Sequence, residues 1–160
     1  DTSGIMLFAL NKHAQRNLSQ LFANRLVEKI YFALSKGKPK KKQGKIVGDL
    51  VKSRNGNYKL SHSKENPSVT RFISFHLDSN EYFFIYAPKT GRTHQLRVVA
   101  KSIKSPILGD KRYNGDKADR LYLHCYKISF KWETEEVSIQ CEPVENEFLK
   151  YSDYFNESIK

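Results

Sequence analysis

Cysteine is scarce in this sequence, since only Cys125 and Cys141 occur among its 160 residues. Neither belongs to a Cys-x-x-Cys pair, and neither stands at the spacing from a histidine that zinc sites use, so we expect neither a disulfide framework nor a metal site. Both cysteines lie in strand-like segments. We therefore expect two ordinary buried thiols in a reducing compartment, and metal binding ranks far behind.

Long apolar runs are also missing. No run reaches transmembrane length, and no segment pairs a large apolar face with a wholly basic one, as membrane-surface helices do. No signal-peptide pattern precedes the first residue, which is Asp1 rather than methionine. We expect a cytoplasmic protein without membrane attachment, whose numbering starts inside a longer chain. The P-loop, GxSxG and dinucleotide-binding patterns are absent too.

Acidic residues are outnumbered. Seventeen Asp and Glu stand against 28 Lys and Arg, which gives a formal net charge of +11. The basic residues are spread over 12–131, whereas 142–160 holds a larger share of the acids. A basic body implies a polyanionic partner, and we expect nucleic acid rather than a membrane. The 39% of hydrophobic residues is enough for a real core in a single domain.

Short apolar stretches separated by turn signals predict a sheet built mainly from successive strands. The run 5–10 is continuous, which is typical of an interior strand, whereas 29–34 alternates as a strand with two unequal faces does. Tyr31 lies on the smaller face of that strand, and on its pattern alone it is a core tyrosine. The other strands are expected over 46–51, 58–60, 69–77, 81–87, 121–130 and 137–141.

Two helices are predicted, one over 12–26 and one starting near Thr90 or Thr93. The polar, acidic stretch 142–160 is expected to be peripheral or helical. Sequential hairpins with only two convincing helices favour an α+β fold: a single domain with a largely antiparallel, mixed β-sheet and a few flanking helices.

Two loops are expected at the edge of this sheet. The segment 37–45 contains five lysines around one proline and one internal glycine, and predicts a flexible cationic loop that could bind phosphates or remain solvated. Asn55 and Gly56 stand between the apolar runs 46–51 and 58–60, which is the strongest local signal for a β-hairpin.

The stretch 90–110 carries the most chemistry. Thr90 or Thr93 can supply the N-cap oxygen of the second helix. One face of that helix is apolar and a neighbouring stripe is basic, which fits either a merely solvated charged face or an anion site at the helix N-terminus. The residues alone leave both interpretations open. The apolar face comprises Leu96, Val99, Ala100 and Ile103, and the stripe comprises His94, Arg97, Lys101 and Lys104.

Four stretches, 1–4, 29–34, 90–110 and 121–125, resemble in the correct order the RluA-type pseudouridine synthases. Residues 90–97 and 105–110 read TGRTHQLR and SPILGD, which is similar to the family signature TGRTHQ(I/L)R and HPI(V/L)GD, and Tyr113 stands at the position of the family's following aromatic residue. The other matches are DTSG at 1–4, KIYFAL at 29–34 against KxYxAxV, and LYLHC at 121–125 against LxLHA.

The resemblance implies the pseudouridine synthase fold and the isomerisation of uridine to pseudouridine in RNA, without a metal, a nucleotide or an organic cofactor. By family habit the RNA is large-subunit ribosomal RNA more often than transfer RNA, and we expect a monomer. The chain, residues 1–160, would be the C-terminal portion of the catalytic domain. A segment with the catalytic Asp, and any S4-type RNA-binding domain, would precede it.

The resemblance also implies roles for individual residues. In the family the nucleophilic Asp belongs to an HRLD-x-DTSG segment, so it is expected two residues before Asp1, and Asp1 itself is not that residue. Tyr31 would stack on the flipped uracil and assist proton transfer, and Arg97 would pair with the catalytic Asp. The other expected substrate contacts are Leu123 as an apolar wall and Arg92, His94 and Gln95 at the rim near the RNA backbone.

Alternatives remain at this point. The family often reads RVHxAxxGHPI, whereas 97–107 lacks the histidine after the valine and the Gly-His before the proline, so the target cannot be transferred from other members. A non-catalytic RNA-binding module derived from the same fold is the main alternative, and it predicts an upstream segment without the Asp. A transfer-RNA pseudouridine synthase comes next, and a nuclease or phosphotransferase ranks last.

Overall fold

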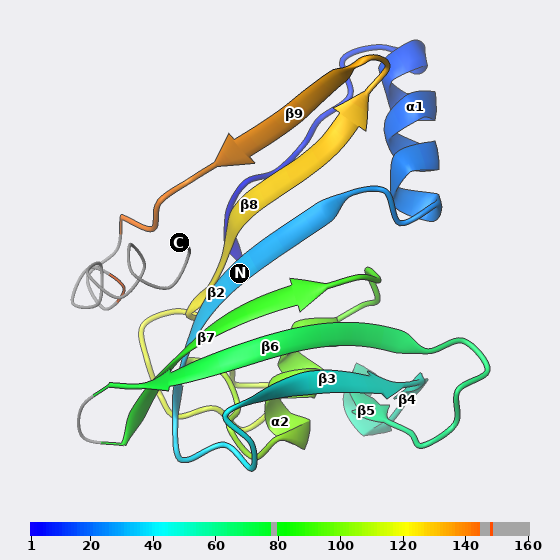
Figure 1. Ribbon diagram of the computed structural model, residues 1–160. Helices are drawn as coiled ribbons and strands as arrows, with labels where there is room; N and C mark the ends of the chain where they lie inside the picture. The colour runs from blue at the N-terminus through cyan, green and yellow to red at the C-terminus, as the bar shows by residue number, and fades with distance from the viewer. Residues whose placement is uncertain (78–79, 145–147, 149–160) are drawn as a thin grey trace.

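The computed structural model describes residues 1–77, 80–144 and 148, and its main feature is one strongly curved, seven-stranded sheet (Figure 1). The strands follow the order β1-β8-β2-β7-β6-β3. The short strand β1 pairs with residues 124–125 of β8, and β9 pairs with residues 127–132 of the same strand. A separate two-stranded sheet joins β4 and β5. The strands are β1 (Ser3–Gly4), β2 (Glu28–Lys36), β3 (Gln43–Gly48), β4 (Leu50–Lys52), β5 (Tyr58–Leu60), β6 (Ser68–His76), β7 (Glu81–Pro88), β8 (Leu123–Trp132) and β9 (Glu135–Gln140), and the helices are α1 (Lys12–Ala23) and α2 (Gln95–Ser102).

All strand pairs are antiparallel except β1 and β8, which run parallel. The predicted α+β class with a largely antiparallel, mixed sheet is confirmed. The predicted pair over 69–77 and 81–87 corresponds to β6 and β7. The described residues include no helix long and apolar enough to cross a bilayer.

Strand β2 separates two apolar clusters, as its alternation predicts. Ala33 packs with Phe84 and the apolar face of α2 on one side, and Tyr31 lies at the margin of this cluster. Phe32 and Leu34 pack on the opposite side with Phe83 and Tyr122. The face of the sheet that carries α2 is therefore the face onto which Tyr31 projects.

The prediction of an interior strand over 5–10 is wrong. Only Ser3 and Gly4 form a ladder with β8, and the following segment runs beside β8 towards α1 without a strand partner in the part of the chain that the structure describes (Figure 1). Ile5 and Leu7 pack against β8, whereas Met6, Phe8 and Leu10 are 70%, 75% and 93% exposed. An interior strand needs neighbours at both edges and on both faces, and this segment has them on one side only.

Helix α1 is shorter at its end than predicted. It begins after Asn11, whose side chain accepts a hydrogen bond from Ala14 N at 2.8 Å, and ends at Asn24. Arg25 then adopts a left-handed conformation (φ 60°), so Leu26 lies outside the helix and is exposed. Leu18 and Leu21 pack on a cluster formed by Val27 and three residues of β8: Cys125, Ile128 and Phe130.

The predicted loop 37–45 is too long, because β3 begins at Gln43 and pairs with β6. The hairpin prediction is right about the turn but wrong about its first strand. Residues 46–48 belong to the main sheet, and β4 alone pairs with β5 around Asn55. Most of 142–160, expected to be peripheral or helical, lies outside the described residues. Of the two cysteines, Cys125 is buried as predicted, whereas Cys141 is partly exposed.

Candidate functional site

A cavity of about 430 Å³ opens where β2, the end of β7, the start of α2 and the entry to β8 meet. Segments far apart in the sequence line it. Asp1 and Thr2 contribute from the N-terminal segment. All six residues singled out in the sequence also line this cavity: Tyr31, Arg92, His94, Gln95, Arg97 and Leu123.

The turn between β7 and α2 is built around the buried amide of Gln95. Its Oε1 accepts hydrogen bonds from Thr90 Oγ1 (2.8 Å) and Arg92 N (3.0 Å). Its Nε2 donates to Thr70 Oγ1 (2.9 Å) and Val69 O (3.2 Å). Both ends of the amide are therefore occupied, and Gln95 holds the turn to β6 where the sequence analysis expected a substrate contact.

The predicted threonine N-cap is wrong. Thr90 Oγ1 accepts from Val69 N and donates to Gln95, while His94 occupies the N-cap position of α2 in a left-handed conformation (φ 56°) without a side-chain cap hydrogen bond. The left-handed backbone at His94 directs its ring away from the helix axis and towards Tyr113.

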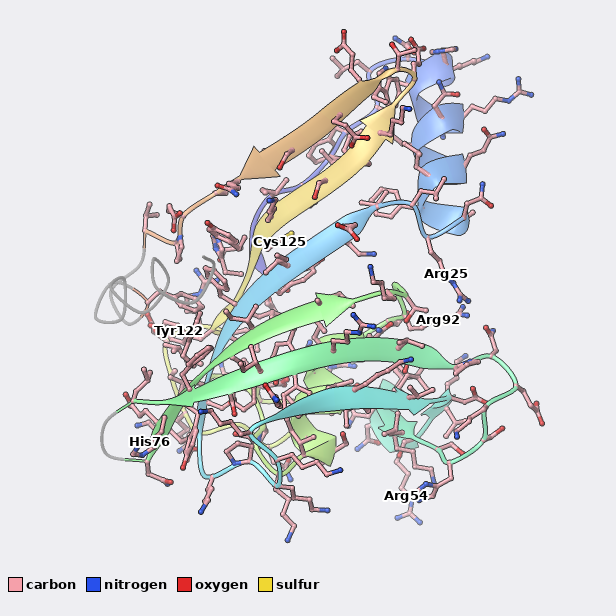
Figure 2. All side chains as sticks on the ribbon, viewed as in Figure 1. Arg25, Arg54, His76, Arg92, Tyr122 and Cys125 are labelled. Atoms are coloured by element: carbon pink, nitrogen blue, oxygen red, sulfur yellow. The ribbon has the colours of Figure 1, made fainter. Side chains whose placement is uncertain are left out.

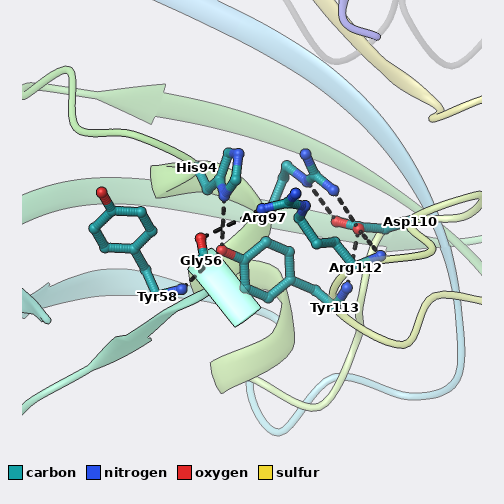
Figure 3. Close-up of polar contacts among 7 residues, drawn as sticks. All are labelled: Gly56, Tyr58, His94, Arg97, Asp110, Arg112 and Tyr113. Carbon is teal, nitrogen blue, oxygen red and sulfur yellow. Dashed lines mark hydrogen bonds and ion pairs between the residues drawn. The ribbon is translucent and has the colours of Figure 1, made fainter. Parts of the chain in front are cut away.

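His94 belongs to a chain of hydrogen bonds with two tyrosines (Figure 3). The Tyr113 hydroxyl accepts from Tyr58 N at 3.1 Å, so its proton is free to be donated to His94 Nδ1 at 2.8 Å. Partial burial, and the positive charges of Arg97 and Arg112, lower the pKa of His94. His94 is therefore a neutral ring at pH 7, and its Nδ1 shares this hydrogen bond with the Tyr113 hydroxyl.

Arg97 is held by Asp110 in a bidentate ion pair (Figure 3). Arg97 Nε donates to Oδ2 at 2.8 Å and Nη2 donates to Oδ1 at 2.6 Å. The Asp110 side chain is fully buried and also accepts from the backbone N–H of Arg112 and Tyr113, while the guanidinium lies 5.2 Å from the centre of the Tyr113 ring. These bonds to Asp110 raise the pKa of Arg97, so a fixed positive charge faces the cavity.

Tyr31 enters the cavity from the middle of β2. It faces Tyr86 on β7 and Cys125 on β8, at a point where the β2–β8 register shifts. Burial, followed by the neighbouring Cys125, raises the pKa of Tyr31, so the phenol keeps its proton at neutral pH. An aromatic ring, a fixed cation and an apolar wall at Leu123 together suit a flat, polar ring such as a nucleobase.

These features agree with the comparisons with known proteins. The family described as RNA pseudouridylate synthase matches residues 1–102. The chain belongs to this family. The RluA-type resemblance is thereby confirmed, since relatives include ribosomal large subunit pseudouridine synthases C and D.

Two relatives show how similar the chain is to other pseudouridine synthases and how much of their length it covers. An uncharacterised RNA pseudouridine synthase of Haemophilus influenzae is 46% identical over 149 residues, which cover 92% of this chain and 66% of that protein. Ribosomal large subunit pseudouridine synthase C of Rickettsia bellii is 35% identical over 136 residues, covering 80% of this chain and 45% of that protein. The chain thus spans from less than half to about two thirds of the length of these relatives.

Solved pseudouridine synthase structures agree with the fold. Human RNA Pseudouridylate Synthase Domain Containing 1 superimposes with a TM-score of 0.71 at 27% identity, over 84% of this chain and 62% of that chain. Human RNA Pseudouridylate Synthase Domain Containing 4 gives a TM-score of 0.67 at 21% identity, over 87% of this chain and 66% of that chain, which is a likeness of fold alone.

Sequence reasoning missed three residues of this site. Asp110 was placed in the family motif without a role, although a buried Gly-Asp beside a cationic helix is a signal for an ion pair. Lys29 stands two residues before Tyr31 in a strand and must share its face. It lines the cavity, and burial lowers its pKa, as does nearby Lys89 to a smaller extent.

The third missed residue is His124, which secures the N-terminal segment beside the cavity. Its Nε2 donates to Cys141 O at 2.7 Å, so its Nδ1 accepts from Ser3 Oγ at 2.8 Å. Ser3 pairs with His124 across β1 and β8, directly after Asp1 and Thr2. The described residues contain no group of three or more His, Cys, Asp or Glu side chains that could hold a metal ion.

Proposed function

We propose that this chain is the uridine-binding part of an RNA pseudouridine synthase, which isomerises uridine to pseudouridine within RNA. The observation that carries the proposal is the convergence in one cavity of Tyr31, Arg97 and Leu123, three residues separated in sequence by 26 or more positions. Family membership supports the reaction class. A cavity of about 430 Å³ lies within the usual size range of small-molecule sites and can hold one nucleoside.

The reaction breaks the bond between uracil and the ribose and remakes it through a ring carbon. Since the product is an isomer, no atom is gained or lost and no cofactor has to supply electrons. The nucleophilic or basic Asp would stand two residues before Asp1. Asp1 and Thr2 line the cavity together with Arg97, so an Asp at that place would enter beside the guanidinium.

Arg97 has the geometry for this role, because Asp110 uses Nε and one N–H of Nη2 and leaves the other donors of the guanidinium for a second carboxylate. Its positive charge would keep the catalytic Asp ionised. Tyr31 would stack on the extruded base and, as a protonated phenol, would donate a hydrogen bond or a proton rather than act as a phenolate base.

The RNA backbone would lie at the basic rim of the cavity. Arg92 donates to Asn66 Oδ1, which fixes the guanidinium near the opening. Lys29 also lines the cavity, and Lys89 is close enough to lower its pKa. Extruding a base costs a few kcal/mol, so we propose a uridine in a loop or bulge as the target. Large-subunit ribosomal RNA is the first RNA to test, because relatives carry that name, and transfer RNA is the second.

The test is a pseudouridine assay on total RNA with the whole protein. Cellular RNA from a strain lacking the protein is incubated with the purified enzyme, treated with a carbodiimide that marks pseudouridine, and read by primer extension. We expect one or a few new stops, in large-subunit ribosomal RNA. RNA that is bound without any new stop would contradict the enzyme proposal and favour a non-catalytic RNA-binding module.

A further inference from the structure

The lysine loop, residues 37–42, is fixed to the body of the protein. Lys40 N donates to Ile103 O at 2.9 Å, at the C-terminal end of α2. Lys42 O accepts from both N (2.7 Å) and Oγ (2.8 Å) of Ser74 on β6. The loop is therefore preorganised, although its composition predicts flexibility.

Four lysine side chains project from this anchored loop, and all four residues are exposed: Lys38, Lys40, Lys41 and Lys42. The loop backbone cannot follow the RNA, but long lysine side chains can reach phosphates without much ordering cost to the backbone. Each phosphate that such a lysine neutralises adds salt-dependent affinity that does not depend on base sequence.

A second cavity of about 610 Å³ lies between the lysine loop and the ends of β6 and β7. Lys38 and Lys42 line it, together with the rings of His76 and Tyr82, whose centres are 5.0 Å apart at an angle of 54°. Glu81, the neighbour of Tyr82 in the sequence, is paired with Lys36 at 3.5 Å. His76 is exposed and Tyr82 is partly buried. Cations beside accessible rings are the combination by which proteins hold single-stranded RNA, because phosphates meet the cations and bases stack on the rings.

Helix α2 connects the two cavities on one face of the sheet. Its N-terminal residues line the first cavity, and its C-terminal end binds the lysine loop about 12 Å away. Lys101 and Lys104 are exposed along this path. Figure 2 shows His76 and Arg92 at opposite ends of β6 and β7.

We propose that the lysine loop and the His76–Tyr82 cavity form a second RNA contact site, which holds the single strand that flanks the target uridine. The proposal rests on the proposed function. Thr70, which contacts the turn at the first cavity, is six residues from His76 on β6, so the sites are roughly 20 Å apart. In a flanking strand that keeps the stacked spacing of a duplex, about 3.4 Å per nucleotide, an RNA must extend about six nucleotides from the target to reach the second site.

Binding of labelled oligouridylate tests whether the lysines of the loop contact RNA phosphates. We compare strands of 5 and 20 nucleotides, across a salt series, with the whole protein and with a triple variant, Lys38→Gln, Lys41→Gln and Lys42→Gln. For the 20-mer, the slope of log K against log salt should fall by about 2, since each single-strand phosphate contact contributes about 0.7. For the 5-mer it should stay unchanged.

The matched control removes three charges elsewhere: Lys12→Gln, Arg16→Gln and Lys131→Gln, all exposed residues of α1 and β8. The control should bind both strands as the wild type does. Equal losses in the two triple variants would mean that net charge alone acts, and would overturn the proposal. So would an equal effect of the loop variant on both RNA lengths.

Substitutions of Tyr82 test whether an RNA base stacks on its ring. Tyr82→Leu should weaken 20-mer binding about tenfold and leave the 5-mer unaffected, whereas Tyr82→Phe should restore wild-type affinity, because stacking needs the ring and not the hydroxyl. Equal affinity of the leucine and phenylalanine variants would overturn the stacking site. Pseudouridine formation is read separately, so an active wild type with an unresponsive loop variant disproves this site alone, and an inactive wild type disproves the proposed function.

Discussion

At the scale of single residues, the ion pair of Arg97 and Asp110 is the most constrained polar contact of the site. The Arg97 side chain is 15% exposed and that of Asp110 is fully buried. A buried carboxylate is tolerated only where charge and hydrogen bonds compensate its desolvation, and Asp110 has the guanidinium and two backbone N–H donors. The position of the Arg97 guanidinium at the cavity therefore depends on Asp110, a residue outside the cavity.

Asp110→Asn should lower the free energy of unfolding by roughly 3 kcal/mol, because it leaves a partly buried arginine without its counter-charge. Urea denaturation measures this. Glu28→Gln is the matched control, since it removes the carboxylate of an exposed pair with Lys89 and should cost less than about 1 kcal/mol. Equal small losses would show that Arg97 does not depend on Asp110.

Tyr86 carries a buried hydroxyl for which the described residues offer no hydrogen-bond partner. Removing an unsatisfied polar atom relieves its desolvation cost, so Tyr86→Phe should raise the free energy of unfolding by about 1 kcal/mol. Tyr122→Phe should lower it by about the same amount, because the Tyr122 hydroxyl donates to Asp119 at 2.9 Å. A loss of stability in Tyr86→Phe would contradict this account.

His94 should make stability pH-dependent. Its pKa is lowered in the folded protein, so between that value and the unfolded value near 6.5 the unfolded chain binds more protons. Stability is then fully present above pH 6.5 and is lost as the pH falls. His94→Asn, which tolerates the left-handed backbone, should lose less stability than the wild type between pH 7 and pH 5. His62→Asn, at an exposed position, is the control and should follow the wild-type curve.

At the scale of elements, the turn after α2 determines where Asp110 lies. Gly109 has φ 78°, and a Cβ there would lie 1.6 Å from Arg120 O, so the turn and the entry to β8 touch at this position. Gly91, in the same family signature, would place a Cβ in open space. Two glycines that look alike in the motif therefore have different structural requirements.

Gly109→Ala should lower the free energy of unfolding by at least about 2 kcal/mol, because it combines backbone strain with a clash against backbone. Gly91→Ala should change it by less than about 0.5 kcal/mol. Thermal or urea unfolding of the two variants decides the matter. A small effect at Gly109 would mean that the turn can move away from β8.

At the scale of the whole molecule, the proposed function assigns RNA binding and catalysis to different sets of residues. The net charge of +11 is spread over many elements, so no single residue carries the affinity for a polyanion. Catalysis, in contrast, is proposed to depend on a few groups in one cavity of about 430 Å³.

Arg97→Ala and Tyr31→Ala in the whole protein should each abolish pseudouridine formation, by at least about a thousandfold, while RNA affinity falls less than about fivefold. Single-turnover assays and filter binding give the two numbers. Arg97→Lys keeps the charge but loses the bidentate geometry, and should retain partial activity. Substantial turnover in Arg97→Ala would remove Arg97 from the mechanism.

Local patterns by themselves determined the largely antiparallel class of the sheet, the pairing of β6 with β7, the two faces of β2 and the apolar face of α2, because these depend on turn signals and on periodicities of two and 3.6 residues. They also marked six lining residues, through the family motifs. Tertiary structure alone decided three things: that 5–10 has packing on one side only, that Nε2 of Gln95 is held by β6, and that Arg97 is held by Asp110. Each depends on a neighbour 13 or more residues away, or on where the neighbouring strands end, and no local period records such contacts.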